Sequence, residues 1–218
     1  MTTAHIAKFS GGEIHITSGG SESTAPNGKV LYKTSADGEW LQSNALITNG
    51  TFDGFNERGN VVAVIIPSKD ASGNDVTSIG EEAFYLRVSL TSVTIPDSVT
   101  SIEERAFIGC SGLTIVTIPD GVTSIGDEVF LDCTSLTSIT IPSSVETFGN
   151  DIITGCPNLH TINCPGRTYA EVDDLTQAGK LSRWPEGEGD YMNYICSDET
   201  YSVVAENDGE GECLWTVV

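Results

Sequence analysis

The sequence predicts an α+β repeat fold, a solenoid whose stacked coils share a parallel β-sheet and contain short helical turns. Two observations carry this prediction. Residues 76–167 consist of four consecutive 23-residue segments with no gap between them, and the same positions are apolar in each segment. A fixed period of roughly 20–50 residues is typical of solenoids, in which each coil buries its apolar face only against its neighbours.

Each segment contains the pattern of one coil. Positions 15–20 read L-x-x-V-x-I, and the apolar–polar–apolar alternation at their end predicts a half-buried strand. Proline follows at position 21 and has no amide hydrogen to continue a ladder, so it ends the strand. Positions 1–4, which read V-T-S-I in three copies, predict a second short strand, and positions 6–10 have room for one helical or 3₁₀ turn. The four segments begin at Val76, Val99, Val122 and Val145.

The flanking residues predict two caps. Residues 61–67 match positions 15–21, so the first solenoid strand is expected near Val61. Strand-like pieces at 5–9, 13–17, 29–34 and 39–41, separated by glycine and asparagine turns, predict an N-terminal β cap.

Residues 168–171, T-Y-A-E, predict a capping box that opens a helix running to about Gly179. Residues 190–218 predict a three-stranded tail, packed on the cap or used for docking. We therefore expect a cap at 1–60, a solenoid at 61–167 (partial repeat 61–75, full repeats 76–98, 99–121, 122–144 and 145–167), and a cap helix with β tail at 168–218.

The repeat resembles that of the BspA-like leucine-rich-repeat proteins, V-T-S-I-G-x-x-A-F-x-x-C-x-x-L-x-x-V-x-I-P, and all four copies follow it. The last copy departs at Phe148, Ile153 and Cys164, a drift that suits a unit next to a cap. The resemblance implies a leucine-rich-repeat solenoid that acts as an extracellular or surface-displayed binding module. Such a module is often adhesive, binds protein or glycan, and has neither enzyme activity nor a cofactor.

The composition limits the classes of partner that the chain can bind. The net charge is −21, and no Lys or Arg occurs from 106 to 166 or from 184 to 218. A phosphate backbone would be repelled, so we expect no nucleic-acid partner. No stretch approaches about 18 apolar residues, so we expect no membrane insertion. The N-terminus lacks a basic start and an apolar run, which predicts no signal peptide and leaves a virion or the cytosol open beside the cell surface.

Motifs for catalysis are missing from the sequence. It contains no G-x-S-x-G, H-E-x-x-H or Walker pattern, and its three histidines have no evident nucleophile partner, so we predict that the chain is not an enzyme. A hydrolase that uses acidic residues is the less favoured alternative.

For the cysteines, a structural role is favoured over a chemical one. Cys110, Cys133 and Cys156 share position 12, which predicts a column of buried thiols. Cys156, His160 and Cys164 have a zinc-like spacing, but a strand would hold the last two about 13 Å apart. A Cys196–Cys213 link is a hypothesis for an oxidising compartment.

One loop weakly resembles a calcium-binding loop. Asp70, Ser72 and Asn74, with Glu81 at the twelfth place, follow EF-hand spacing. Asp75 stands where glycine is required, and no helix is expected before Asp70. A solvated loop is the simpler interpretation, and a loose Ca²⁺ site stays an alternative.

The outward strand positions 16, 17 and 19 predict a flat, uncharged sheet of Ser and Thr. Threonine suits exposed strands in any case. The functional interpretations are a platform for a protein or glycan partner, a structural component of a virion or surface fibre, or, least favoured, a water-ordering array. The predicted binding face comprises Thr91, Ser92, Thr94, Thr114, Thr117, Thr137, Ser138, Thr140, Thr161 and Asn163. The oligomeric state is not predicted.

Overall fold

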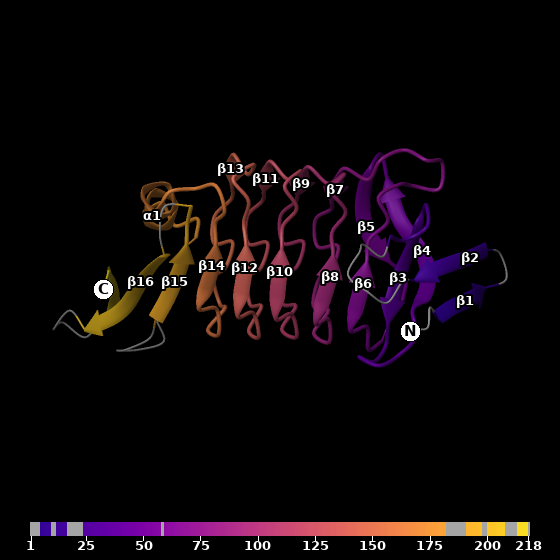
Figure 1. The fold of residues 1–218 in the computed structure, drawn as a ribbon, viewed down its shortest axis with the longest axis horizontal. Coiled ribbons are helices and arrows are strands. Elements are labelled where there is room, and N and C mark those ends of the chain that lie inside the picture. Colours follow the sequence, from indigo (N-terminus) through magenta and orange to yellow (C-terminus); the bar gives the residue numbers. More distant parts are fainter. Residues whose placement is uncertain are drawn as a thin grey trace.

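The computed structural model describes residues 5–9, 12–16, 24–57, 59–181, 191–197, 200–207 and 213–217. It is an elongated stack of coils that runs from the N-terminal strands to the C-terminal ones (Figure 1). Each coil contributes a front strand at positions 17–19 and a back strand at positions 3–4. The front strands are β6 (Ala63–Ile65), β8 (Ser92–Thr94), β10 (Ile115–Thr117), β12 (Ser138–Thr140) and β14 (Thr161–Asn163). The back strands are β5 (Thr51–Phe55), β7 (Ser78–Ile79), β9 (Ser101–Ile102), β11 (Ser124–Ile125) and β13 (Thr147–Phe148).

The register follows the 23-residue repeat. In the front strands Val116 pairs with Ile139, and Ile139 pairs with Ile162, all at position 18. Val64 pairs with Val93, which confirms that residues 61–67 take positions 15–21 of an earlier coil. Identical positions therefore stack directly above one another, and the apolar ones form columns inside the solenoid.

The core is built from these columns. The rings of Phe84, Phe107 and Phe130 stack with centroids 4.8 Å and 5.4 Å apart, and all three are fully buried. The valines at position 1 and the leucines at position 15 are also buried in every full repeat. Each coil thus gains its hydrophobic stabilisation from the coils beside it, as the periodicity predicts.

The corner between back and front strands is a series of tight turns. Hydrogen bonds run from i+3 to i, for example from the Ala106 amide to the Glu103 carbonyl, as in a 3₁₀ turn. Two left-handed residues, at positions 7 and 11, keep the turn from continuing as a helix. Position 7 is never glycine: Glu82, Arg105, Glu128 and Asp151 have φ between 53° and 56°. Position 11 is left-handed at Leu86, Gly109, Asp132 and Gly155.

The N-terminal strands extend both sides of the first coil. β1 (His5–Phe9) and β2 (Gly12–Ile16) form a hairpin. β3 (Lys29–Lys33) pairs antiparallel with β4 (Leu41–Thr48) and with β6, while β5 pairs parallel with β7. The expected strand at 39–41 is instead the start of β4, whose hairpin with β5 turns at Asn49-Gly50 with both residues left-handed. Asn-Gly favours this two-residue turn because both residues tolerate positive φ.

The C-terminal end is closed by a helix and further strands. Helix α1 (Tyr169–Gln177) starts with the predicted capping box, in which Thr168 and Glu171 each bond the other's backbone amide. Val172 and Leu181 are fully buried. β15 (Tyr191–Ile195) pairs parallel with β14 and is followed by antiparallel β16 (Thr200–Asn207) and β17 (Cys213–Val217). The tail therefore continues the row of front strands (Figure 1).

Among the described helices, none has the length and apolar character needed to cross a membrane.

Candidate functional site

The predicted Ser/Thr positions lie on the outer side of the front strands, a surface called here the front face. Its residues are Thr91, Ser92, Thr94, Thr114, Ile115, Thr117, Thr137, Ser138, Thr140, His160, Thr161 and Asn163. Residues of the first two full repeats are exposed, whereas Ser138, Thr140, Thr161 and Asn163 are half-buried. Position 18, between them, points inward. The front face is therefore open to a partner mainly over β8 and β10.

Hydroxyl groups on the front face have two different roles. The hydroxyls of Thr91 and Thr137, at position 16, donate to the carbonyls of Val62 and Thr114 in the preceding coil, at 2.8 Å and 3.0 Å. These two hydroxyls hold neighbouring coils together. The hydroxyls of Ser92, Thr94 and Thr117 make no hydrogen bond to another described group of the protein. They are free to bond water or a partner.

The row of front strands is interrupted once, between β8 and β10. β6 pairs with β8, and β10 pairs with β12, but β8 and β10 belong to different sheets although they are neighbours in the stack (Figure 1). At the other joints the position-20 amide donates to the next coil, as from Ile66 to Thr94 and from Ile118 to Thr140, both at 3.1 Å. The corresponding bond from Ile95 to Thr117 is missing among the described residues. We call this interruption the seam.

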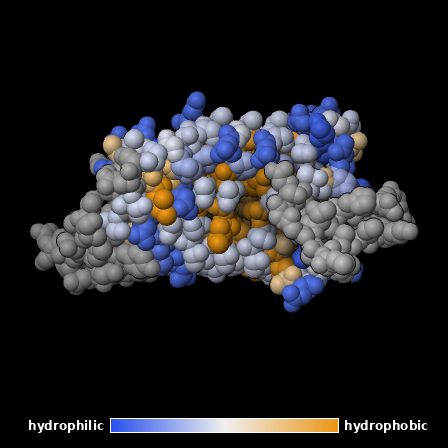
Figure 2. All heavy atoms as spheres, viewed as in Figure 1, coloured by the Kyte–Doolittle hydropathy of each residue, from blue (hydrophilic) through white to orange (hydrophobic). Residues whose placement is uncertain are grey.

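The seam opens into a groove of about 550 Å³ on the front face. Val93 is only half-buried there, whereas Val116, Ile139 and Ile162 at the same position are buried. Figure 2 shows apolar residues gathered in the middle of this face, where Figure 1 places β8 and β10. The apolar residues of the lining are Ala25, Ile65, Ile66, Val93, Ile95, Pro96 and Pro119, and the polar ones are Thr24, Ser68, Thr94, Asp97, Ser98 and Thr117.

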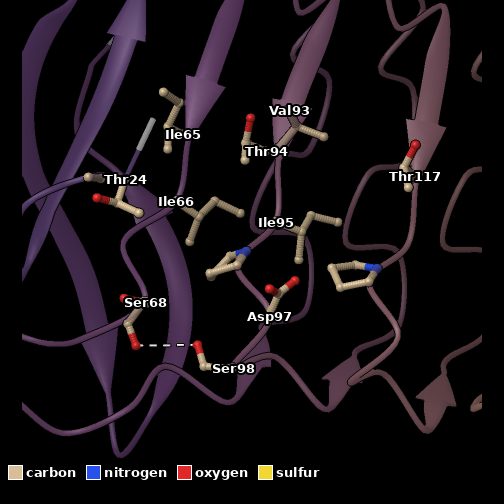
Figure 3. A pocket seen from close by; sticks show the side chains of 13 residues that line it. Thr24, Ile65, Ile66, Ser68, Val93, Thr94, Ile95, Asp97, Ser98 and Thr117 are labelled. Carbon is tan, nitrogen blue, oxygen red and sulfur yellow. Dashed lines mark hydrogen bonds between the residues drawn. The ribbon is translucent and has the colours of Figure 1, made fainter. Parts of the chain in front are cut away.

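Figure 3 shows how the groove is assembled from separate coils. Ile66 and Ile95 come from neighbouring coils and lie beside each other, with Asp97 close to Ile95. The Ser98 hydroxyl donates to the Ser68 carbonyl at 3.3 Å and to the Val76 carbonyl at 2.7 Å, which ties the two coils below the groove. The sequence does not reveal this groove, because the residues around it follow the same template as those at the closed joints.

The calcium candidate is a self-bonded loop. Asp70 Oδ1 accepts from the amides of Ser72 and Asn74 at 2.8 Å and 2.9 Å, and Asp70 Oδ2 accepts from the Asn74 side chain at 2.9 Å. These bonds lower the pKa of Asp70, with the Asn74 side chain as the first cause. A cation bound by Asp70, Ser72, Asn74 and Glu81 would compete with them. The described residues contain no group of three or more His, Cys, Asp or Glu that could hold a metal ion.

The position-12 cysteines form the expected buried column. The thiols of Cys110, Cys133 and Cys156 donate to the carbonyls of Phe84, Phe107 and Phe130 of the preceding coils, at 3.1, 3.3 and 3.1 Å. Burial raises the pKa of Cys110 to about 12 and raises that of Cys133 further. Thiols held in the protonated form are poor nucleophiles and poor metal ligands, so this column is structural.

Two further hypotheses concern the zinc-like spacing that includes Cys156 and Cys164, and a link between Cys196 and Cys213. Cys156 and Cys164 are both buried, and Cys164 takes a core position at the end of the last coil. The Cys196–Cys213 hypothesis lies outside the described side chains, because that of Cys213 is not described.

Arg87 occupies position 12 in the first full repeat, where the other three have cysteine. Its guanidinium donates to the Phe55 carbonyl at 3.1 Å and to the Glu57 carbonyl, and lies 4.5 Å from the centre of the Phe55 ring. Arg87 thus makes the same inter-coil bond that the thiols make, with a longer side chain that reaches the N-terminal strands.

Comparison with known proteins identifies the family. Residues 53–174 match the BspA type leucine rich repeat region in six copies. This match covers more than half of the chain, and the chain belongs to that family. The family's repeats commonly mediate protein interactions, and its members are typically not enzymes. No curated protein matches the chain.

Solved structures of leucine-rich-repeat proteins are similar to this chain. One from Bacteroides capillosus is 31% identical, with 66% of this chain and 100% of that chain covered and a TM-score of 0.49. A leucine rich cell surface protein from Faecalibacterium prausnitzii is 25% identical, covering 66% and 40%, with a TM-score of 0.45. The T. pallidum leucine rich repeat protein is 24% identical, covering 56% and 68%, with a TM-score of 0.45.

Proposed function

We propose that this protein is a non-catalytic interaction module that binds a protein or glycan partner through the front face. The observation that carries the proposal is the exposed, uncommitted hydroxyl groups of Ser92, Thr94 and Thr117 on neighbouring strands. A hydroxyl group both donates and accepts hydrogen bonds, so a row of them suits peptide and sugar groups alike.

Charge on the front face supports the same proposal. No Asp, Glu, Lys or Arg occurs at positions 16, 17 or 19, although the chain carries 31 acidic residues. A partner that docks on this face therefore meets no buried carboxylate, whose desolvation would cost several kcal/mol. The carboxylates of Asp97 and Asp120, both exposed at position 22, border the face instead. There they can steer a basic partner toward the face.

A second candidate is a structural component of a larger assembly, such as a virion or a surface fibre. β17 is the last strand of its sheet in the described part of the chain. A strand at a sheet edge presents unpaired backbone groups to another chain, so the C-terminal tail favours this alternative.

We also propose that the chain divides into an N-terminal cap, a solenoid and a C-terminal tail, with boundaries at residues 60 and 167.

The first experiment locates the native protein. Quantitative mass spectrometry of washed cells, cytosol, culture supernatant and purified particles shows where it is enriched, and cross-linking in that fraction identifies its partner. Enrichment on cells supports binding, and fixed stoichiometry in particles supports the assembly role. A purely cytosolic protein would count against both adhesion and a virion role.

The second experiment tests the front face with matched variants. Thr94→Lys, Thr117→Lys and Thr140→Lys are combined in one variant. Its control combines Thr77→Lys, Thr100→Lys and Thr123→Lys, which lie at position 2 of the same repeats and are also exposed. Both variants add three positive charges. We expect the cross-linked partner to bind the control and not the front-face variant, with both folded; equal binding by the two would refute the assignment of the face.

A further inference from the structure

We propose that the groove at the seam holds an apolar side chain of a basic polypeptide segment, so that the partner of the front face is anchored there by a leucine- or phenylalanine-like residue next to Lys or Arg. The inference rests on the proposed function, since it places that partner on the same face. It adds the partner's chemistry and the point of attachment.

The lining explains the choice of an apolar side chain. Seven of the thirteen lining residues are apolar, and they come from four separate segments of the chain. Val93 is an interior residue by its place in the repeat, yet the seam leaves it half-buried. Ile115 on the neighbouring strand is 59% exposed, where the other repeats have Ser or Thr. Val93, Pro96 and Pro119 are the half-buried apolar residues of the lining, and covering their exposed surface yields about 25 cal/mol per Å², so an apolar group gains free energy by entering.

The missing backbone hydrogen bond at the seam is the reason why the proposed ligand is a polypeptide. At the seam the Ile95 amide and the Thr117 carbonyl, both on groove residues, are not bonded to each other as their equivalents are at the other joints. A bound peptide backbone can satisfy one donor and one acceptor of this kind, whereas a purely apolar ligand cannot. An apolar anchor inside a polar rim is also the usual arrangement of binding energy at protein interfaces.

The charges explain why the segment is expected to be basic. Asp97 is the only charged residue of the lining, and exposed Asp120 directly follows Pro119 of the lining. Both occupy position 22 of consecutive coils. Lys69, which directly follows Ser68 of the lining, is already paired with Asp75 at 2.7 Å. A Lys or Arg beside the anchor would form charge-assisted hydrogen bonds with these carboxylates, and the net charge of −21 would speed its approach.

The test uses the full chain and a defined peptide set. Fluorescein-labelled octapeptides carry one leucine or phenylalanine between two lysines in a Gly-Ser background, and binding is measured by fluorescence anisotropy at low and high salt. We expect a dissociation constant below about 1 mM that weakens with salt. Replacing the apolar residue by serine, or the lysines by glutamate, should weaken binding at least about tenfold. If none of the lysine-containing peptides binds, the inference is overturned.

Matched protein variants locate the binding site. Thr94→Trp places a large side chain at the groove, and Thr140→Trp makes the same change at position 19 two coils away, where the ladder is closed. We expect peptide affinity to fall about tenfold in Thr94→Trp and to stay within about twofold in Thr140→Trp. Asp97→Asn should reduce the salt dependence of binding. Circular dichroism confirms that each variant is folded.

The outcomes separate this inference from the proposed function. Equal peptide affinity in Thr94→Trp and Thr140→Trp overturns the groove assignment, even if the lysine variant of the front face loses its cross-linked partner. Conversely, a loss of peptide binding in Thr94→Trp alone supports the apolar anchor in the groove, even if the cross-linked partner does not bind the rest of the front face.

Discussion

The first and third full repeats, residues 76–98 and 122–144, come from one template and share most of their buried positions. In both, positions 1, 4, 9, 15 and 20 are buried. The third repeat has a thiol at position 12 and is closed on both sides, since β12 pairs with β10 and with β14. The first repeat has Arg87 at that position, and β8 is paired only with β6. Tyr85, Leu86 and Val88 at its corner are about half exposed.

This comparison indicates that the buried columns hold the register of the coils and that the front ladder does not. The back strands β7 and β9 remain paired at the level of the seam, and Phe84 still stacks on Phe107. The outer positions are therefore available for binding without loss of the fold.

Truncation of the aromatic column should cost about 3–5 kcal/mol in either repeat. Phe84→Ala should be the more severe, because Phe84 contacts Phe107 at 4.8 Å and also Phe52 at 5.6 Å, whereas Phe130 stacks on Phe107 alone. Urea denaturation gives the free energies of unfolding. The exposed neighbour Tyr85→Ala serves as the control and should change the stability by less than about 1 kcal/mol. A smaller loss of stability in Phe84→Ala than in Phe130→Ala would contradict this expectation.

Arg87→Ala should cost about 2–3 kcal/mol, since it removes charged hydrogen bonds to two carbonyls of the N-terminal strands. Cys133→Ala removes one weaker thiol bond and a small apolar group, and should cost less than Arg87→Ala. Thermal unfolding of both variants measures the difference. The reverse order would mean that the N-terminal strands depend little on the first repeat.

Alkaline pH should destabilise the protein through its thiols. Burial raises the pKa of Cys110 from 9.0 to about 12, so above pH 9 the unfolded state loses thiol protons that the folded state keeps. The unfolded state then binds fewer protons, and stability falls as pH rises between 9 and 12. The free energy of unfolding, measured below pH 9 and again above it, should decrease less in Cys110→Ala than in the parent chain. Arg87→Ala should not reduce the slope, because the Arg87 guanidinium lowers the pKa of Cys110 and its removal raises that pKa further. Equal slopes in Cys110→Ala and the parent chain would contradict the assignment.

Leu86→Gly should stabilise the first repeat by about 1 kcal/mol, because a branched residue is strained at its φ of 51°. Asp132→Gly, at the same position of the third repeat with φ of 59°, should gain less, since aspartate tolerates this region better. Chemical denaturation of the pair provides the comparison. Val88→Gly is the control and should not stabilise. A gain from Asp132→Gly larger than that from Leu86→Gly would contradict the strain argument.

The smallest effect concerns the threonines at position 16. Thr137→Val should cost about 1 kcal/mol by removing the hydroxyl bond to the Thr114 carbonyl. Thr114→Val should cost close to nothing, because Thr114 lies at the seam and the corresponding bond to Thr91 is missing there in the described structure. Equal costs in thermal unfolding would mean that the seam closes in solution.

The sequence predicted what depends on the buried pattern. The 23-residue spacing placed position 18 inside and positions 17 and 19 outside, and it aligned Val64 with Val93 across an insertion. The capping box at Thr168 and Glu171 was also readable, because two side chains at a fixed spacing define it. These features follow from local chemistry repeated many times, so one degenerate copy does not hide them.

Other features left no such trace in the sequence. The left-handed residues at position 7 include Glu82, Arg105 and Glu128, none of which signals positive φ. The hairpin turn at Asn49-Gly50 does carry a signal in the sequence, since Asn-Gly favours a two-residue turn, and it marks the end of β4 better than the strand expected at 39–41. The seam was not predictable at all, because Thr91, Thr114 and Thr137 are identical residues at one position. The location of the seam depends on how complete coils pack against each other.

The parallel pairing of β15 with β14 gives the solenoid an adjustable length. β15 occupies the place of a further front strand without using the repeat template, and it pairs with the last, degenerate coil. Inserting or deleting one 23-residue unit after Val122 would lengthen or shorten the face by one strand spacing, about 4.8 Å, and leave the groove intact. The reach of such a protein could thus vary among its relatives in discrete steps while its point of attachment stayed constant.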